Sequence, residues 1–293
     1  MYEELKGVID MHIHSGPEPA DRLMDFMELA KLADSVNMGG FVMKGLFTST
    51  AEWATMIRKT FPNLLVFGGI TTDFTMGGLN AEAVISSIRM GGKIVWMPVR
   101  NSRHSYEMFK KGVFNFATPI SDGAVDKGIS LFKEGSEKIR DEVIEILKII
   151  KESDVCLATG HISPKESIAV INEAHDMGIR KMMVTHPVTP NIGMTLDQQK
   201  VASKSGAIIE HTLGYSMLDS YLSVRQDPEL MVESLKEIGP SKCIISTDSG
   251  RKTYPNMAEG MRMFISWLKE MGFTSKDIDS MTKDNPKYLL GVA

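Results

Sequence analysis

The sequence predicts an α/β fold in which eight strands alternate with helices and close into a (β/α)8 TIM barrel. Short runs of apolar, often β-branched residues recur along the chain, and most are followed by an amphipathic helical pattern with a start signal. This alternation is typical of parallel sheets, and eight such units in 293 residues fit a closed barrel better than an open sheet. We therefore expect residues 1–293 to form a single barrel domain.

The first four strand–helix units are regularly spaced. Their strands are expected at residues 8–14, 40–44, 64–70 and 93–99. The first helix is expected over about residues 21–36, the second from a capping box at 49–52 to residue 61, and the third from Asn80 to near residue 90.

The connection after the fourth strand is longer than the others. It contains a small strand and turn at residues 128–135, followed by a helical pattern over about 136–152. The stretch from residue 100 to 127 is too short and too poor in periodic apolar residues to build its own core. The sequence therefore predicts an insertion over about residues 100–135, between strands four and five of the same domain.

The second half of the chain resumes the alternation. Strands are expected at residues 155–159, 182–185, 207–209 and 243–246. Helix start signals precede the helices that follow, at Ser163-Pro164, Thr195 and Asp227-Pro228. Helices near residues 255–271 and 275–290 end the chain, and the second of these is an extra C-terminal helix beyond the eight units.

Charge and composition exclude several kinds of partner. The formal net charge is -4 with both signs interspersed, which argues against binding to nucleic acid or to an anionic membrane. No secretory leader or membrane-length apolar run is recognisable, and Cys156 and Cys243 lie in apolar runs typical of buried, reduced thiols. We expect a cytoplasmic protein that acts on a small molecule, and the sequence leaves open whether it forms a homo-oligomer.

Histidines and acids gather at the ends of the predicted strands. His12 and His14 end the first strand, where alternate side chains share a face. The other strand-end residues are His161 after strand five, His186 after strand six, Glu210 and His211 after strand seven, and Asp248 after strand eight. Because the carboxyl ends of barrel strands meet at one mouth, these imidazoles and carboxylates predict a site for a divalent transition metal.

The ordered set of strand-end ligands resembles the amidohydrolase superfamily of metal-dependent hydrolases. The C-terminal run Asn285-Pro286-Lys287-Tyr288-Leu289-Leu290-Gly291 is also similar to the Asn-Pro-Ala-x-Leu-Leu-Gly ending common in that superfamily. The resemblance covers nearly the whole chain and is specific to the superfamily, not to a substrate. The chain looks like a minimal barrel member, because His12 lies too near the start to leave room for the flanking β-sandwich that many members carry.

The resemblance implies the roles of these residues. His12 and His14 would hold one metal together with Asp248, and His161 and His186 would bind a second metal, or one would bind while the other polarises the substrate. One or two divalent ions are expected, zinc first, with manganese, iron or nickel as alternatives. Such ligands leave a coordination position for water and lower its pKa, and Asp248 can accept the water's proton as general base.

The sequence departs from the family pattern at the bridging ligand. Binuclear members often carry a carboxylated lysine or a glutamate at the end of strand four, and residues 94–99 offer neither. Lys44, which ends strand two, could be carboxylated instead, or could stay cationic and bind an anionic substrate. Glu210 is the other candidate bridge.

Several further residues near the predicted mouth are candidates for substrate binding. They are Lys44, Arg100, His104, His211 and Arg251. Their positive charges would favour a substrate that carries a carboxylate or a phosphate. The leading hypothesis is a hydrolase that uses metal-activated water on a small anionic amide, lactone, ester or phosphoester. The alternatives are a metal-dependent decarboxylase or other lyase of the same superfamily, and a non-catalytic metal-binding barrel.

Overall fold

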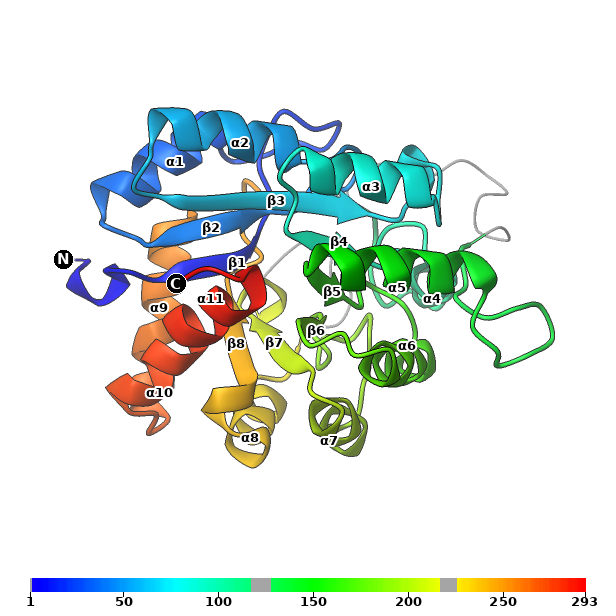
Figure 1. Cartoon of the computed structure of the whole chain (residues 1–293). Helices are drawn as coiled ribbons and strands as arrows, with labels where there is room; N and C mark the ends of the chain where they lie inside the picture. The colour runs from blue at the N-terminus through cyan, green and yellow to red at the C-terminus, as the bar shows by residue number, and fades with distance from the viewer. Residues whose placement is uncertain (1, 117–127, 217–225) are drawn as a thin grey trace.

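The computed structural model describes residues 2–116, 128–216 and 226–293 (Figure 1). Eight strands form one sheet in which each strand pairs in parallel with the next along the chain. The strands are β1 (Ile9–Ile13), β2 (Gly40–Met43), β3 (Leu65–Thr71), β4 (Ile94–Trp96), β5 (Cys156–Ala158), β6 (Met182–Val184), β7 (Ile208–Thr212) and β8 (Cys243–Ser246).

The sheet closes into a barrel where the end of β1 meets the end of β8. The His14 amide donates to the Ser249 carbonyl over 2.8 Å, and the Asp248 amide donates to the His12 carbonyl over 2.9 Å. These two bonds form a closing seam between the first and last strands. The predicted (β/α)8 barrel is confirmed.

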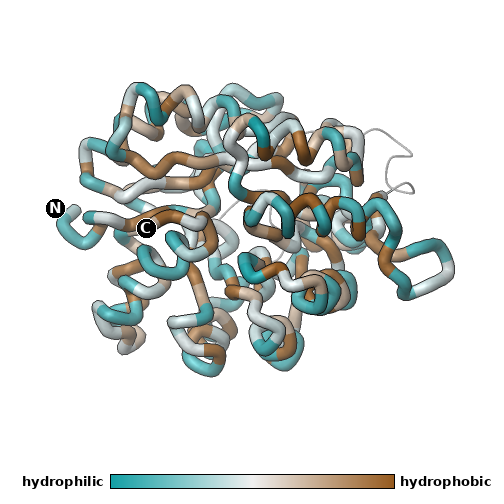
Figure 2. The backbone as a smooth tube through the Cα atoms, in the orientation of Figure 1, coloured by the Kyte–Doolittle hydropathy of each residue, from teal (hydrophilic) through white to brown (hydrophobic). Residues whose placement is uncertain are grey.

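Helices surround the sheet and turn their apolar faces toward it (Figures 1 and 2). They are α1 (Phe26–Ser35), α2 (Ala51–Thr60), α3 (Ala81–Arg89), α5 (Asp141–Ser153), α6 (Pro164–Asp176), α7 (Leu196–Lys204), α8 (Pro228–Ile238) and α9 (Met257–Glu270). Short 3-10 turns lie at Glu3–Leu5, Phe74–Met76, Gly214–Ser216 and Pro240–Lys242. Among the described residues, none of the helices combines the length and the apolar character needed to cross a bilayer.

The chain ends in an extra helical segment, as predicted. It consists of α10 (Ser275–Asp279), a π-helical turn (Ser280–Asp284) and α11 (Asn285–Leu290). The Asn285 side chain donates to the carbonyl of Cys243, where β8 begins, and Leu289 and Leu290 pack against an apolar cluster made of strand residues. The segment therefore covers the N-terminal end of the barrel and leaves the opposite end for the site.

Most predicted helix starts are confirmed by cap geometry. Asn80 accepts from two amides at the start of α3, and Ser163 and Thr195 each form a capping box with the residue three positions later. Asp227 likewise caps α8. The capping box expected at residues 49–52 forms only in part: the Ser49 hydroxyl accepts from the Ala51 amide and donates to the Glu52 carboxylate, and Thr50, the N-cap residue, makes no side-chain cap bond.

Four predicted boundaries are corrected by the structure. α1 begins at Phe26 instead of residue 21, because Asp25 is its cap. α5 begins at Asp141 instead of residue 136, and residues 128–132 form isolated bridges and no strand. β7 runs on to Thr212, so Glu210 and His211 lie inside the strand and not after it. The insertion contains α4 (Arg103–Lys110), which the sequence did not predict, and its residues 117–127 lie outside the described part.

A β-bulge in β1 lies directly beneath the site. Asp10 pairs with Phe41 and Ile13 pairs with Met43, so β1 carries one more residue than β2 across this interval. Bulges of this kind re-aim side chains next to active sites. Here the bulge falls at Met11 and His12, directly before the histidine-bearing end of the strand.

Candidate metal centre

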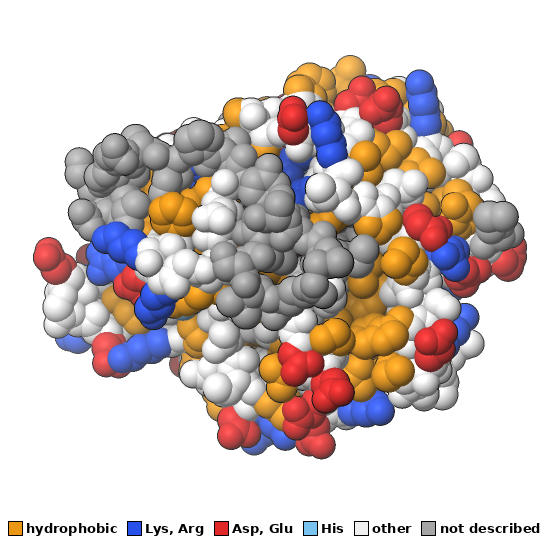
Figure 3. All heavy atoms as spheres, turned by 180° about the vertical axis from the view of Figure 1, so that it is seen from behind, with side chains coloured by type: hydrophobic (Ala, Val, Ile, Leu, Met, Phe, Trp, Pro, Cys, Tyr) orange, Lys and Arg blue, Asp and Glu red, His pale blue; other side chains and the backbone are white. Residues whose placement is uncertain are grey.

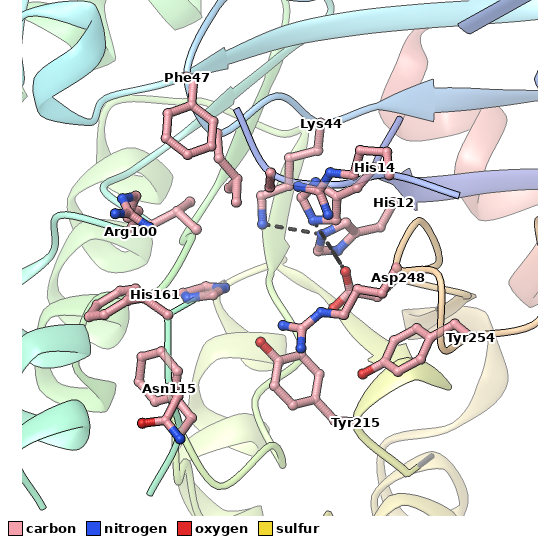
Figure 4. Close-up of a pocket in the computed structure, with 17 residues that line it drawn as sticks. His12, His14, Lys44, Phe47, Arg100, Asn115, His161, Tyr215, Asp248 and Tyr254 are labelled. Atoms are coloured by element: carbon pink, nitrogen blue, oxygen red, sulfur yellow. Dashed lines mark hydrogen bonds and ion pairs between the residues drawn. The ribbon is translucent and has the colours of Figure 1, made fainter. Parts of the chain in front are cut away.

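A cavity opens at the C-terminal ends of the strands (Figure 4). Strand ends supply His12, His14, Lys44, His161 and Asp248 to its lining. Loops supply other lining residues, among them Arg22, Phe47, Arg100, Tyr215, Arg251 and Tyr254. In Figure 4, Arg100 and Phe47 lie across the cavity from His12 and Asp248.

Asp248 lies close to both His12, in β1, and His14, the residue after β1. One of its oxygens, Oδ1, lies 3.4 Å from Nε2 of His12 and 3.3 Å from Nε2 of His14. The closing seam sets this geometry, because Asp248 and His12 are joined through their backbones as well. The first and last strands therefore deliver three donor atoms to one point.

His161 and His186 form a second histidine pair beside the first. Their Nε2 atoms lie 3.1 Å apart, a spacing at which two imidazoles share either a proton or a cation. The rings of His186 and His12 are stacked with centroids 5.7 Å apart. One ligand atom from each of His12, His186 and Asp248 falls within 4.8 Å of the other two, so these residues form a group that could hold a metal ion.

Two polar residues outside this cluster orient its rings. Nδ1 of His12 lies 3.2 Å from both carboxylate oxygens of Glu210. Nδ1 of His186 lies 3.0 Å from the Thr189 hydroxyl, which donates its own proton to the His186 carbonyl and so accepts the ring proton. Protonation at Nδ1 leaves the Nε2 lone pairs facing the cluster, which is how metal-binding histidines are commonly held.

The electrostatics of the cluster fit a divalent cation. Burial lowers the pKa of His12, His14, His161 and His186 well below the ordinary imidazole value, so all four rings are neutral ligands at pH 7. Burial also raises the pKa of Glu210 to about 8, so its carboxylate needs a nearby positive charge to stay ionised. A cation held by His12 would supply that charge.

The backbone is strained at two of these residues. His186 has a φ of 26° and Asp248 a φ of 51°, in the left-handed region that residues other than glycine seldom adopt. Such conformations persist only where surrounding contacts hold them, and they concentrate at functional sites. The strain at two strand ends that meet in one cluster supports a functional role for it.

Lys44 is almost wholly buried within the same group. Its Nζ lies 3.2 Å from Nε2 of His12 and 5.8 Å from the centroid of the Trp96 ring. Burial lowers its pKa. The lysine therefore lies where it can contact both the metal ligands and a substrate.

Comparison of the sequence with family models gives a match over residues 7–210, to a family of unknown function, DUF6282. The chain belongs to this family. No curated protein sequence matches it.

Solved structures of the same fold come from several bacteria. The organophosphorus hydrolase of Deinococcus radiodurans is 11% identical with a TM-score of 0.59, over 99% of this chain and 93% of that one. A zinc-bound amidohydrolase from Burkholderia multivorans is 9% identical with a TM-score of 0.56, over 98% and 99%. A candidate 2-pyrone-4,6-dicarboxylic acid hydrolase from Pseudomonas putida is 10% identical with a TM-score of 0.57, over 97% of each. At these identities the likeness shows the fold alone, and the DUF6282 chain has the (β/α)8 barrel that its sequence predicted.

Two residues expected at the substrate lie elsewhere in this family member. His104 is buried on α4, and its Nε2 is 3.1 Å from the Ile192 carbonyl. His211 follows Glu210 in β7 and faces the opposite side of the strand, where its Nε2 is 3.1 Å from the Ser234 hydroxyl of α8. Neither is among the described residues that line the cavity, so the expectation that they bind the substrate is not supported.

The structure adds cavity residues that the sequence did not single out. Tyr215 packs against His186 with ring centroids 5.0 Å apart, and Arg22 reaches the cavity from the loop after β1. Arg100 and Arg251 line the cavity as expected, with Arg100 between the rings of Phe47 and Phe116. Loop residues of this kind carry no periodic signal, so sequence spacing alone could not find them.

Proposed function

We propose that this protein is a metal-dependent hydrolase of small anionic substrates that carry an amide, lactone, ester or phosphoester bond. The observation that carries the proposal is the convergence of four neutral imidazoles and one carboxylate at the floor of a cavity lined by cations. The structural relatives include a hydrolase of organophosphorus compounds and a zinc-bound amidohydrolase, which is consistent with it.

The donor set assigns the metal ligands in this proposal. His12, His14 and Asp248 would hold one ion, and His161 and His186 would hold a second or share the first. A bound divalent ion would lower the pKa of a water and polarise the substrate, with zinc proposed first and manganese, iron or nickel as alternatives. Glu210 contacts His12 through Nδ1, which makes it an orienting partner in place of a bridging ligand.

Asp248 is the proposed general base. Burial favours its neutral form, but positive charge on neighbouring groups, Lys44 and Arg251 among them, lowers the pKa of Asp248, so the carboxylate is ionised. In hydrolysis, its free oxygen would take a proton from the attacking water as the new bond to carbon or phosphorus forms. The same proton would then pass to the leaving group as the scissile bond breaks. If His186 does not bind a metal, its ring would instead polarise the substrate.

Lys44 has two proposed roles that mass spectrometry distinguishes. As a cation, it would bind the anionic substrate beside His12. As a neutral amine, it would add carbon dioxide, release a proton and become a carboxylate that bridges two metals. In native spectra recorded at mildly alkaline pH, where a lysine carbamate survives, no added mass beyond bound metal supports the first role, and the added mass of one carbon dioxide that disappears in the Lys44→Gln variant identifies the second.

Labelled water tests the reaction class. The purified protein with its metal is offered lactones, esters and phosphoesters that carry carboxylate or phosphate groups, in water enriched in oxygen-18. Hydrolysis predicts one labelled oxygen per product molecule. Release of carbon dioxide without label would instead identify the decarboxylase alternative, and no turnover with stoichiometric metal bound would identify a non-catalytic barrel.

Matched variants test the residues. Asp248→Asn should lower kcat by roughly a thousandfold or more, because both a ligand and the base are lost. His175→Asn, which alters an exposed histidine on α6, should leave kcat unchanged. If Asp248→Asn is as active as His175→Asn, Asp248 is neither a ligand nor the general base, and the proposed site is wrong.

The remaining expectations stay proposals. We propose that residues 1–293 act as one barrel domain, and that the protein is cytoplasmic and takes a small-molecule substrate. Both cysteines are free and buried, which is consistent with a reducing compartment. Acidic and basic side chains are interspersed on the face seen in Figure 3, which is consistent with the expectation that nucleic acid is not a partner.

A further inference from the structure

We propose that Arg22 and Arg251 form an anion-binding pair next to the metal centre, and that Glu18 is the positioning residue that orients Arg22. The pair would take a carboxylate or phosphate group of the substrate. This inference rests on the proposed function, because it assigns a substrate group to the same cavity.

The loop after β1 is folded so that Arg22 cannot swing freely. Within this loop, the Gly16 amide donates to the Met24 carbonyl over 2.9 Å, and the Phe26 amide donates to the Gly16 carbonyl over 3.1 Å. These two bonds close residues 16–26 into a compact turn. Arg22 lies inside it, and its side chain is only 5% exposed.

The same loop is bonded to the loop after β8, which carries Arg251. The Leu23 amide donates to the Gly250 carbonyl over 2.8 Å, so the two arginines flank a direct backbone contact. Gly250 packs on β1 so tightly that a Cβ there would lie 2.1 Å from the His14 carbonyl oxygen. Both arginines line the cavity, and this packing places their loops against a proposed metal ligand.

Glu18 fixes the orientation of the Arg22 guanidinium. Its Oε2 accepts from Nε of Arg22 over 2.7 Å and also from one terminal nitrogen, while its Oε1 accepts from the Leu46 amide over 2.7 Å. The Glu18 side chain is 3% exposed. Both of its oxygens are therefore engaged, and the carboxylate ties Arg22 to the loop after β2.

This pairing leaves part of the guanidinium available to a ligand. A guanidinium has five N–H donors in a planar fork, and the bonds to Glu18 engage its Nε edge. Within residues 2–116, 128–216 and 226–293, no other acceptor is bonded to Arg22. A bound anion would engage these remaining donors with charge-assisted bonds.

The charge of the cavity favours an anion as the occupant. Among its described lining residues, Arg22, Lys44, Arg100 and Arg251 are basic, and Asp248 is the acidic one. Planar arginine pairs suit the oxygens of carboxylates and phosphates, which accept two parallel bonds. The position beside His14 would bring the anionic group close to the reacting bond.

Calorimetric titration of the metal-loaded protein with two probes, inorganic phosphate and benzoate, tests the pair. Arg22→Ala and Arg251→Ala should each weaken binding of at least one probe by about tenfold or more, the loss expected for a charge-assisted bond. The probe that loses affinity distinguishes a phosphate-binding from a carboxylate-binding site. Arg262→Ala is the matched control, because Arg262 forms an Arg–Glu pair with Glu259 on the outer helix α9. It should leave both affinities unchanged.

Further variants separate positioning from general structural loss. Added methylguanidine should restore binding to Arg22→Ala, and Arg22→Lys should restore it only in part, because an ammonium cannot supply the planar fork. Glu18→Gln should weaken the same probe while metal content stays at the wild-type level. If Arg22→Ala binds both probes within twofold of wild type, the pair is refuted. Metal content is measured in every variant, so that loss of the metal, which would contradict the proposed function, is recognised separately.

Discussion

The two walls of the cavity are built in different ways. One wall, the strand-end wall, consists of His12, His14, His161 and Asp248, together with His186, which contacts His12 and His161. The rest of the lining, here called the loop wall, comes from loops and includes Arg22, Phe47, Arg100, Tyr215, Arg251 and Tyr254. Backbone bonds of the sheet position the first set, whereas side-chain pairs and loop-to-loop bonds position the second.

The difference separates chemistry from recognition. Strand ends are held by the whole barrel, so their donor atoms can meet within a few ångströms without help from neighbouring loops. Loops can change in length and sequence without disturbing the sheet. We infer that the strand-end wall sets the reaction and that the loop wall sets which substrate undergoes it.

The largest expected effect comes from the strand-end wall. Replacement of His12 and His14 together by alanine should reduce bound metal to background and kcat/KM by about a thousandfold or more, because two of three ligands on one ion are removed. Elemental analysis of the purified variant measures the metal. If the variant keeps its full metal content, His12 and His14 are not the metal ligands and the strand-end wall does not set the reaction.

A smaller loss is expected one contact further out. Glu210→Gln removes the charged partner of His12 and should weaken metal affinity by roughly 10- to 100-fold. Metal affinity is measured by competition with a chelator. His211→Asn is the control, because this neighbouring side chain faces α8. Equal losses of metal affinity in both variants would show that the substitutions act by destabilising the fold and not through the contact between Glu210 and His12.

On the loop wall, Arg100→Ala should raise KM by about tenfold and leave metal content unchanged, because one charged contact to the substrate is lost. Steady-state kinetics on an identified substrate measure it. Lys252→Ala, in an exposed ion pair with Asp21, should leave KM unchanged. Loss of metal from Arg100→Ala would show that the two walls are not independent.

The smallest effect is expected far from both walls. Burial raises the pKa of Cys243 to about 12, and it also raises the pKa of Cys156, so both thiols stay protonated at neutral pH. A thiol reagent should therefore label neither residue in the native protein and both in urea. Rapid native labelling would indicate that the strands open, and that the strand-end wall is less rigid than its bonds suggest.

The sequence predicted the barrel well, because strand and helix periods repeat and the cap residues are local signals. It predicted α1 too early, since Leu23 fits the helical period while its amide bonds to Gly250, a contact that spacing does not reveal. It missed α4, which lies in a segment with little apolar periodicity.

The candidate site divides in the same way. The sequence predicted the site residues at strand ends, because the end of a barrel strand places its side chain at the mouth of the barrel. Glu210 and His211 were not separated, because β7 continues through both and alternation sends them to opposite faces. Arg22 was missed altogether, since its place depends on Glu18 and on a loop from the other end of the chain.

The closing seam has a consequence for how the protein matures. A cation shared by His12 and Asp248 would act as a non-covalent cross-link between the two ends of the barrel sheet, and the loop that it closes contains most of the chain. Because such a site exists only after the two ends have met, metal uptake would stabilise the folded state and would not occur on a growing or truncated chain.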